Sequence, residues 1–484
     1  MSPYTDKGSH ELRLKHGGFT PKIAGRPTRD LVELTMPNRL VIDLKRGGLS
    51  YSPAVRSGEE VAFGRPLATV SAAGGTLSLP APARGRVSVS ETEAGTRVVI
   101  DEATVDTTAE GFAAHVPERV SREQINGILA TGGVWPFLWS SRTRGIPRLD
   151  APEGPRAIIV NFVLTEPFRA RGRVIITRSW ARIVAGIRFL QRMVSDYGSI
   201  EIVLTAPDDP VAKMIYQDLS GYALIHIHSV PLVYPIENPR ILVDALRRDD
   251  SQLSDDDEIW VLDSQGVEAL GACMSEGLPV GERVVVTGGP GQHDPKHYVA
   301  RIGTPISGLG LPNDGALVLR GGLLTGVPVD PASESVGFDD DSFFCLPRAT
   351  ERETLSLIRP GFTRTSYNRS FASRLTGHYD SHITASLRGE RRACIACGIC
   401  ENVCPAGIMP QVIHRYLHRG MTDEAAKSGL DLCVECNLCT YVCPSKIELT
   451  QQFVQAKQQI SAERKEMLAV EARAHGANRT EEKS

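Results

Sequence analysis

The sequence predicts a multidomain fold that combines a small β domain, an α/β domain, a second β module and a helical C-terminal domain. The chain has 484 residues, which is more than one hydrophobic core usually supports. Its pattern also changes along its length. Short apolar runs punctuated by glycine and proline come first, apolar strands alternating with helical periodicity follow, and a cysteine-rich segment lies near the end. These changes indicate separate structural units.

An N-terminal segment, residues 1–31, precedes an expected barrel-sandwich domain over residues 32–105. Its short runs RLVIDL, PLATVSA and TRVVIDE alternate with glycine and proline, as in all-β units. The segment PAPARGRVSV is similar to the turn of a biotinyl or lipoyl carrier domain. No lysine lies near residues 81–86 to carry a prosthetic group, so we interpret this domain as a scaffold.

Residues 106–155 should form a connecting helix and a loop rich in tryptophan and arginine, with the sequence INGILATGGVWPFLWSSRTRGIPRLDAP. Over residues 156–300, strands such as AIIVNFV, IEIVLTA, LIHIHSV, IWVLDS and RVVVTGG alternate with helical segments. This alternation favours a Rossmann-like parallel sheet flanked by helices. The GGPG run at 288–291 lacks the G-x-G-x-x-G pattern, so we interpret it as a turn.

Three further segments complete the predicted organisation. Residues 301–341 have the short strands and glycines of a β-grasp-like module for ligand binding or docking. Residues 342–392 form an arginine-rich linker, either a basic arm against a partner or a solvated segment that wraps its own domain. The polar residues 451–484 have a helical composition, and we expect a frayed tail.

Charge and cysteine usage narrow the class of protein. With 54 basic and 57 acidic residues the net charge is −3, which gives no reason to expect a nucleic-acid partner. We expect no transmembrane segment and a cytoplasmic location, because no run reaches about 18 apolar residues and no signal peptide is evident. Of ten cysteines, eight crowd between Cys394 and Cys443, whereas Cys273 and Cys345 stand alone. This distribution indicates metal binding rather than a disulfide framework.

The cysteine segment contains the same pattern twice, as CIACGICENVCP and CVECNLCTYVCP. Both copies read C-x₂-C-x₂-C-x₃-C-P, in which the fourth cysteine binds the cluster of the other copy. The repeat therefore predicts a helical ferredoxin-type domain with two [4Fe–4S] clusters over residues 393–450. The expected ligands are Cys394, Cys397, Cys400 and Cys443 for the first cluster, and Cys433, Cys436, Cys439 and Cys404 for the second.

A zinc site is the alternative, since four cysteines also suit Zn²⁺. Zinc motifs use paired C-x₂-C units, however, and the triple spacing followed by C-P in both copies favours cubane clusters. His414 and His418 lie one helical turn apart. Because the cysteines already supply a full ligand set, we interpret both histidines as surface or packing residues.

The order of these units resembles one family, which contains the A subunit of the sodium-translocating NADH:quinone reductase and the C subunit of the Rnf electron-transport complex. The opening HGGFTPKIAGRP looks like the Gly-Gly start and Pro-x-Ile-Ala-Gly motif of the reductase subunit, and TGGVWPFLWSSRTRGIP is similar to its Trp-containing loop. The reductase subunit usually keeps a decayed cysteine domain, whereas this chain resembles the Rnf subunit there. The whole chain resembles the A subunit of the reductase, but with a two-cluster domain retained.

The same resemblance bears on flavin binding. In the Rnf subunit, a Gly-Gly-x-Gly-Phe-Pro loop helps to bind FMN and NADH, and an acidic Glu-Cys-Glu-Pro follows the next strand. This chain has GGVWPFLW at the first place and VLTEP, residues 163–167, at the second. Close approach to a flavin requires glycine, and Trp135, Pro136 and Phe137 would obstruct it. We therefore expect neither FMN nor NADH here.

The resemblance implies an oxidoreductase subunit, peripheral on the cytoplasmic side of the membrane, that passes electrons toward quinone. Its partners would be integral membrane subunits and other redox subunits, with a quinone site at an interface with a membrane subunit. Trp135, Arg142 and Arg144 are candidate binding residues, and burial of Trp135 and Trp139 in the core is the alternative for the tryptophans. Two other functions stay open: an NADH-oxidising FMN and iron–sulfur subunit like that of Rnf or the cobalamin reductases, and a scaffold with structural clusters.

Overall fold

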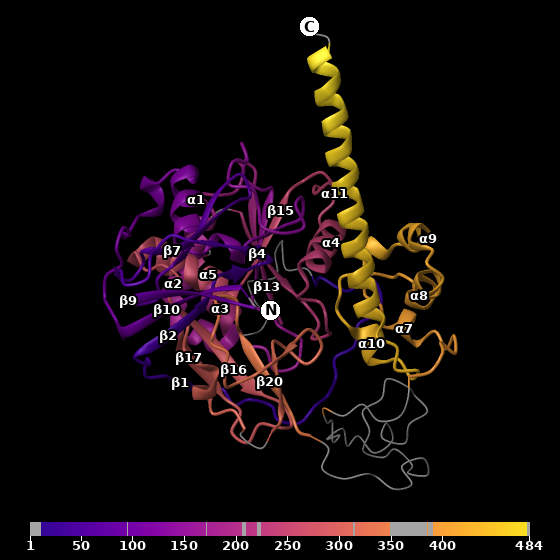
Figure 1. Ribbon diagram of the computed structural model, residues 1–484, viewed down its shortest axis with the longest axis horizontal. Helices are drawn as coiled ribbons and strands as arrows, with labels where there is room; N and C mark the ends of the chain where they lie inside the picture. Colours follow the sequence, from indigo (N-terminus) through magenta and orange to yellow (C-terminus); the bar gives the residue numbers. More distant parts are fainter. Residues whose placement is uncertain are drawn as a thin grey trace, which may run out of the picture. The chain divides into compact units, whose positions relative to one another are not determined.

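The computed structural model describes residues 11–93, 95–170, 172–205, 210–219, 224–312, 315–348, 385 and 391–481. These residues fall into two compact units (Figure 1). The first unit holds residues 11–13, 20–348 and 385, and the second holds residues 14–19 and 391–481. No helix among the described residues combines the length and the apolar character that a membrane span requires.

The first unit begins with the β structure that the alternating runs predict. A four-stranded sheet has the order β2-β10-β9-β6 and a three-stranded sheet has the order β5-β7-β8. In β2, Leu40 and Ile42 are completely or almost completely buried between less buried neighbours, which is the period-two burial of a strand with one face on a core. The strands are β2 Arg39–Asp43, β3 Lys45–Arg46, β4 Leu49–Ser50, β5 Ser52–Pro53, β6 Glu60–Val61, β7 Pro66–Ala72, β8 Gly75–Pro80, β9 Arg84–Thr92 and β10 Gly95–Thr104.

The connecting segment contains the predicted helix, α1 Arg122–Thr131, after the short η1 Pro117–Arg119. The side chain of Ser121 accepts from the Gln124 amide and the Gln124 side chain accepts from the Ser121 amide, a capping box that fixes where α1 begins. The tryptophan loop follows as the single turn η2 Trp135–Phe137 and the short strand β11 Trp139–Ser140.

The predicted parallel sheet is present, in the order β11-β15-β12-β13-β14 with β11 antiparallel. Every residue of β12 and β13 is buried, as expected for parallel strands covered on both faces. The helices α2 and α5 approach so closely that a Cβ on Gly271 would lie 1.8 Å from the Arg182 carbonyl oxygen. The elements are β12 Ala157–Asn161, α2 Gly172–Leu190, β13 Ser199–Leu204, α3 Pro210–Leu219, β14 Ile225–Ser229, α4 Pro239–Asp249, β15 Ile259–Asp263, α5 Ser264–Gly271 and the π-turn η3 Ala272–Glu276.

A second sheet, in the order β1-β17-β16-β20-β18-β19, departs from the predicted organisation. The run RVVVTGG was expected to complete the parallel sheet, but as β16 it pairs antiparallel with β17, and β1 joins the same sheet from the N-terminal side. The apolar pattern of a strand does not encode its partner strand, which explains this error. The elements are β1 Leu31–Glu33, β16 Glu282–Gly288, β17 His297–Arg301, η4 Ile306–Leu309, β18 Leu317–Arg320, β19 Val327–Val329 and β20 Ser342–Leu346.

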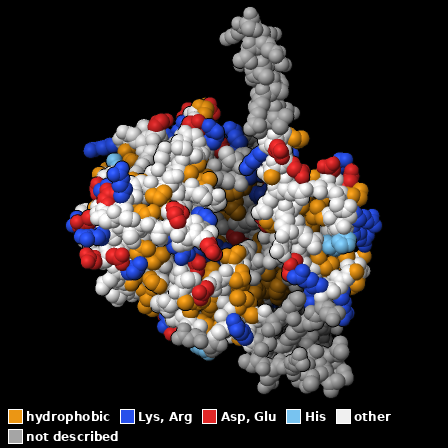
Figure 2. Space-filling model, viewed as in Figure 1, with side chains coloured by type: hydrophobic (Ala, Val, Ile, Leu, Met, Phe, Trp, Pro, Cys, Tyr) orange, Lys and Arg blue, Asp and Glu red, His pale blue; other side chains and the backbone are white. Residues whose placement is uncertain are grey.

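The start of the predicted arginine-rich linker is also part of this sheet. Strand β20 has the sequence SFFCL and is buried throughout, with Phe343 and Cys345 fully inaccessible. Most of the remaining linker, residues 349–384 and 386–390, lies outside the described residues. On the face seen in Figure 2, acidic and basic side chains are interspersed over the described surface rather than gathered by sign.

The second unit is helical around the cysteines, as predicted, and its C-terminal helix differs from the expected tail. Helix α11 begins at Leu449, and Leu449, Phe453 and Ala456 are buried at intervals of four and three residues. This narrow apolar stripe anchors the first two turns, although the segment is mostly polar. The elements are α7 Ile399–Asn402, α8 Pro410–His418, α9 Thr422–Lys427, η5 Leu430–Leu432, α10 Leu438–Tyr441 and α11 Leu449–Glu481.

A buried polar cluster ties the edge strand β14 to β13. The Glu201 carboxylate lies 3.0 Å from Nδ1 of His226 and 2.6 Å from Nε2 of His228, and it accepts a hydrogen bond of 2.5 Å from the Ser199 hydroxyl. Burial raises the pKa of Glu201, but the hydrogen bonds from both histidines and Ser199 outweigh it and lower the pKa to about 2. The pKa of His226 is raised, chiefly by its hydrogen bond to Glu201.

We therefore expect Glu201→Gln to destabilise the first unit by about 1–3 kcal/mol, and the difference from wild type to depend on pH. The contribution of Glu201 to the free energy of unfolding is present above its ordinary pKa of 4.5 and is lost as pH falls toward 2. The contribution of His226 to the free energy of unfolding is present below pH 6.5, its ordinary pKa, and is lost as pH rises through the raised pKa. Thermal unfolding from pH 3 to 9 should show the largest difference between about 4.5 and 6.5. The exposed Glu93→Gln is the control, and a pH-independent difference would contradict the assignment.

Candidate metal centre

The two cysteine loops have the same unusual backbone. Ala396 and Glu435, each two residues after the first cysteine of its copy, have φ values of 53° and 58°. Gly398 and Asn437, two residues further on, have φ values of 72° and 62°. Left-handed conformations cost a residue with a side chain about 1–2 kcal/mol, so their recurrence at matching places indicates a functional requirement. Alternation of right- and left-handed residues points successive amides inward, a nest that binds anions and iron–sulfur clusters.

The thiol of the last cysteine lies with the first copy. Burial raises the pKa of Cys400 to about 11, and the neighbouring thiols of Cys397 and Cys443 contribute to the rise. Cys443 belongs to the second copy, forty-three residues after Cys400 in the chain. The fold therefore brings Cys443 close enough to Cys400 to affect its pKa.

Thiols of the first copy also affect the cysteines of the second copy. The pKa of Cys436 is raised, mainly by burial and also by the thiols of Cys439, Cys433 and Cys404. Burial likewise raises the pKa of Cys439 to about 12, and Cys433, Cys404 and Cys400 add to it. Cys404 and Cys400, both from the first copy, thus lie close enough to the second copy to affect the pKa values of its cysteines.

Polar partners of the sulfur atoms also recur between the copies. Cys400 Sγ lies 3.4 Å from Gln411 Oε1, and Cys439 Sγ lies 3.4 Å from Thr450 Oγ1. In both cases the partner follows its cysteine by eleven residues. Groups of this kind beside sulfur adjust the reduction potential of a cluster when one is bound.

The surroundings of the cysteines are apolar but unequal. Ile408, Ile413 and Phe453 form a buried shell around them. Cys400, Cys404, Cys433, Cys436 and Cys439 are buried, whereas Cys394 and Cys443 are half-buried and Cys397 is exposed. The set expected for the second cluster, Cys433, Cys436, Cys439 and Cys404, is therefore shielded from solvent more completely than the set expected for the first.

The alternative for the cysteines is a mononuclear metal site. Among the described residues, no three or more His, Cys, Asp or Glu side chains converge as a mononuclear metal site requires. Four zinc ligands would have to meet around one ion, each sulfur about 2.3 Å from it. His414 Nδ1 lies 2.7 Å from Gln452 Oε1, so this histidine has a packing role in the helical unit.

The tryptophan loop separates into a buried and an exposed part. Trp135 is fully buried, its Nε1 donates to the Pro147 carbonyl at 2.9 Å, and its ring lies edge-on to Trp260 at 5.5 Å. Trp139 is half-buried. Arg142 and Arg144 are exposed, and Arg142 donates to the Asp256 carbonyl at 3.2 Å. Of the three candidate binding residues, only these two arginines therefore present their side chains at the surface.

The acidic residue of VLTEP lies in a network that sequence analysis overlooked. Buried Glu166 accepts from the amides of Leu324 and Thr325 at 2.8 Å each and from the Thr325 hydroxyl at 2.8 Å. It also forms an ion pair of 3.0 Å with Arg169. The loop around it is so tight that a Cβ on Gly322 would lie 2.1 Å from the Glu166 carboxyl carbon. The glycine-rich run GGLLTG was the available signal, and its amide groups hold a carboxylate of the same chain.

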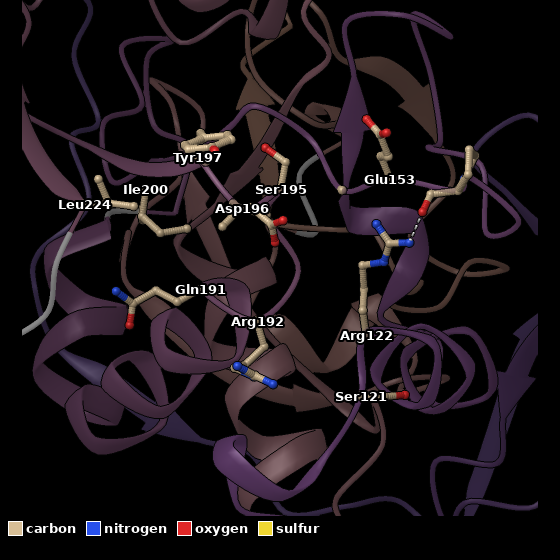
Figure 3. Close-up of a pocket in the computed structure, with 14 residues that line it drawn as sticks. Ser121, Arg122, Glu153, Gln191, Arg192, Ser195, Asp196, Tyr197, Ile200 and Leu224 are labelled. Carbon is tan, nitrogen blue, oxygen red and sulfur yellow. Dashed lines mark hydrogen bonds between the residues drawn. The ribbon is translucent and has the colours of Figure 1, made fainter.

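A cavity of 770 Å³ lies beside the parallel sheet (Figure 3). Its lining includes Gly154, Gly198 and Leu224, which precede the strands β12, β13 and β14. Ligands of open parallel sheets bind outside the carboxyl ends of the strands, whereas this cavity is at the amino ends. Arg122, which lines it, donates to the Ala151 carbonyl at 3.4 Å and to the Pro152 carbonyl. The position of the cavity therefore differs from that of a dinucleotide site.

Comparison with known proteins agrees with both units. Residues 120–278 match the family described as NqrA second alpha/beta domain, and residues 393–448 match a 4Fe-4S dicluster domain. The A subunit of the Na(+)-translocating NADH-quinone reductase from Pseudomonas aeruginosa is 28% identical over 431 residues, covering 86% of this chain and 92% of that protein. The corresponding subunits of Rhodopirellula baltica and Tolumonas auensis are 28% and 26% identical, and the matches cover 79% and 86% of this chain and 83% and 92% of those proteins.

The chain therefore joins an α/β domain similar to the second domain of NqrA to a cysteine unit similar to 4Fe-4S dicluster domains. More particularly, the chain is a homologue of the A subunit of the Na(+)-translocating NADH-quinone reductases over most of its length, and it carries a cysteine domain typical of 4Fe-4S proteins. The resemblance expected from the sequence is confirmed.

The burial of Trp135 generates a direct test. We expect Trp135→Ala to cost about 3–5 kcal/mol of unfolding free energy, since it empties a core site and removes the indole's hydrogen bond. Arg142→Ala, at the exposed end of the same loop, should change stability by no more than about 0.5 kcal/mol. Chemical denaturation of both variants measures the two effects, and a Trp135→Ala cost below about 1 kcal/mol would contradict a core role.

Proposed function

We propose that this chain is the peripheral iron–sulfur subunit of an ion-translocating NADH:quinone reductase complex, and that it passes electrons toward quinone. The observation that supports the proposal is that thiols of the two C-x₂-C-x₂-C-x₃-C-P copies lie close together, with Cys443 near Cys400 and Cys404 near Cys436. Two bound [4Fe–4S] clusters would supply one-electron transfer.

The residues of the chain have distinct roles in this proposal. Cys394, Cys397, Cys400 and Cys443 hold the first cluster, and Cys433, Cys436, Cys439 and Cys404 hold the second. The nests of both loops offer amides to the sulfur atoms, and the apolar shell excludes water from the second set. We place the chain on the cytoplasmic side of the membrane, bound to integral membrane subunits, with Arg142 and Arg144 as the exposed loop residues for that contact.

An NADH-oxidising flavoprotein is the competing function, and two features of the first unit oppose it. Trp135, in the loop that would have to approach a flavin, is packed into the core. The amides of Leu324 and Thr325 already donate to the Glu166 carboxylate, so they are not available to a phosphate group. Electrons would therefore arrive from partner subunits rather than from NADH bound to this chain.

Anaerobic purification followed by iron, acid-labile sulfide and FMN analysis tests the proposal. We expect about eight irons per chain, no flavin, and no reduction of the clusters when NADH is added under EPR observation. Dithionite reduction of the same sample is the positive control for cluster signals. Bound FMN with NADH-reducible clusters would make this chain the electron input subunit, and zinc in place of iron would refute the cluster assignment.

The ligand exchange makes a second prediction. Cys404→Ser should abolish the same EPR signal as Cys436→Ser, although these residues belong to different copies. Cys443→Ser should likewise match Cys400→Ser. Each variant should retain about four irons, since one complete ligand set remains. If Cys404→Ser instead matched Cys400→Ser, each copy would hold its own cluster and the proposed exchange would be wrong. Cys273→Ser, which alters a buried thiol of the first unit, is the control.

A further inference from the structure

The two cysteine sets differ in the charges that lie beside them. Lys457 Nζ, from helix α11, donates to the Cys433 carbonyl at 2.6 Å and forms an ion pair of 2.8 Å with Glu435. Glu435 belongs to the loop of the second set. At the matching place in the first loop the residue is Ala396, which has the same left-handed backbone but no charge. This ion pair is therefore a feature of the second set.

The helix holds Lys457 in this place. Ala456, the preceding residue, is buried, and Phe453 one turn earlier is fully buried. The lysine side chain is 22% exposed, whereas the Glu435 side chain is 46% exposed. Solvent screens an exposed charge more strongly than a shielded one, so the lysine has the larger effect on the interior.

We infer that Lys457 is a positioning residue that raises the reduction potential of the cluster held by Cys433, Cys436, Cys439 and Cys404. The inference rests on the proposed function. Reduction adds one electron and hence one negative charge to the site, and no bond or proton is exchanged. A fixed cation beside Cys433 stabilises the reduced state, whereas the Glu435 carboxylate opposes it. The two residues therefore adjust one potential in opposite directions.

An EPR-monitored redox titration of the full chain tests this assignment. In Lys457→Met, the ratio of reduced to oxidised second cluster at a fixed potential should fall about tenfold, which is about 59 mV for one electron. In Glu435→Gln the ratio should rise, by less than about tenfold, and the double variant should lie between the single ones. The first cluster is an internal control that should not shift.

Two more variants keep the test decisive. Lys457→Arg keeps the charge and should restore most of the shift. Lys427→Met removes a lysine that pairs at 2.9 Å with Glu424 on α9, and it should leave both potentials unchanged. The inference is overturned if Glu435→Gln does not raise the second potential, or if both clusters shift equally in Lys457→Met. Wild-type protein that bound no cluster at all would instead refute the proposed function.

Discussion

The second unit depends on one constraint, which is that thiols of the two cysteine copies come close together although the copies are far apart in the chain. Cys443 lies near Cys400 and Cys404 lies near Cys436, so the arrangement cannot form from local sequence alone. The small apolar shell of Ile408, Ile413 and Phe453 would be a weak core for so short a segment. Cofactors bridging the two copies would supply the missing stabilisation, since binding free energy is also folding free energy when a site assembles from distant residues.

The same constraint explains local features that would otherwise be costly. A left-handed Glu435 or Ala396 is unfavourable in an isolated loop, yet both copies keep this conformation at the same place. In the second copy the Glu435 amide donates to Cys433 Sγ at 3.4 Å, so the left-handed backbone there supplies a hydrogen bond to sulfur. Side chains then differentiate two sites whose backbone is the same. Gln411 stands where Thr450 stands in the other copy, and Lys457 serves only the second.

Sequence patterns predicted those parts of the fold that local chemistry determines. The cysteine spacing predicted a helical unit around the cysteines, and the alternation of strands and helices predicted the parallel sheet. The strand β16 was assigned to the wrong sheet. An apolar run such as RVVVTGG is compatible with pairing in either sheet, and only tertiary packing determines which sheet it joins. The anchored start of α11 was missed because three buried residues in a polar helix, Leu449, Phe453 and Ala456, give a weak periodic signal. Contacts between distant segments, such as Glu166 with Thr325 and Lys457 with Glu435, leave no local pattern in the sequence.

The first unit shows how a crevice suited to an anion can be occupied by the protein itself. Consecutive amides at Leu324 and Thr325 form the kind of concavity that binds phosphate, and the Glu166 carboxylate fills it. Arg169 links Glu166 to Asp341, so two segments far apart in the chain are joined by buried charges. Removing one member would leave an uncompensated buried charge, which typically costs about 3–5 kcal/mol. A network with this cost of opening favours a fixed site filled by Glu166 over a site that exchanges ligands.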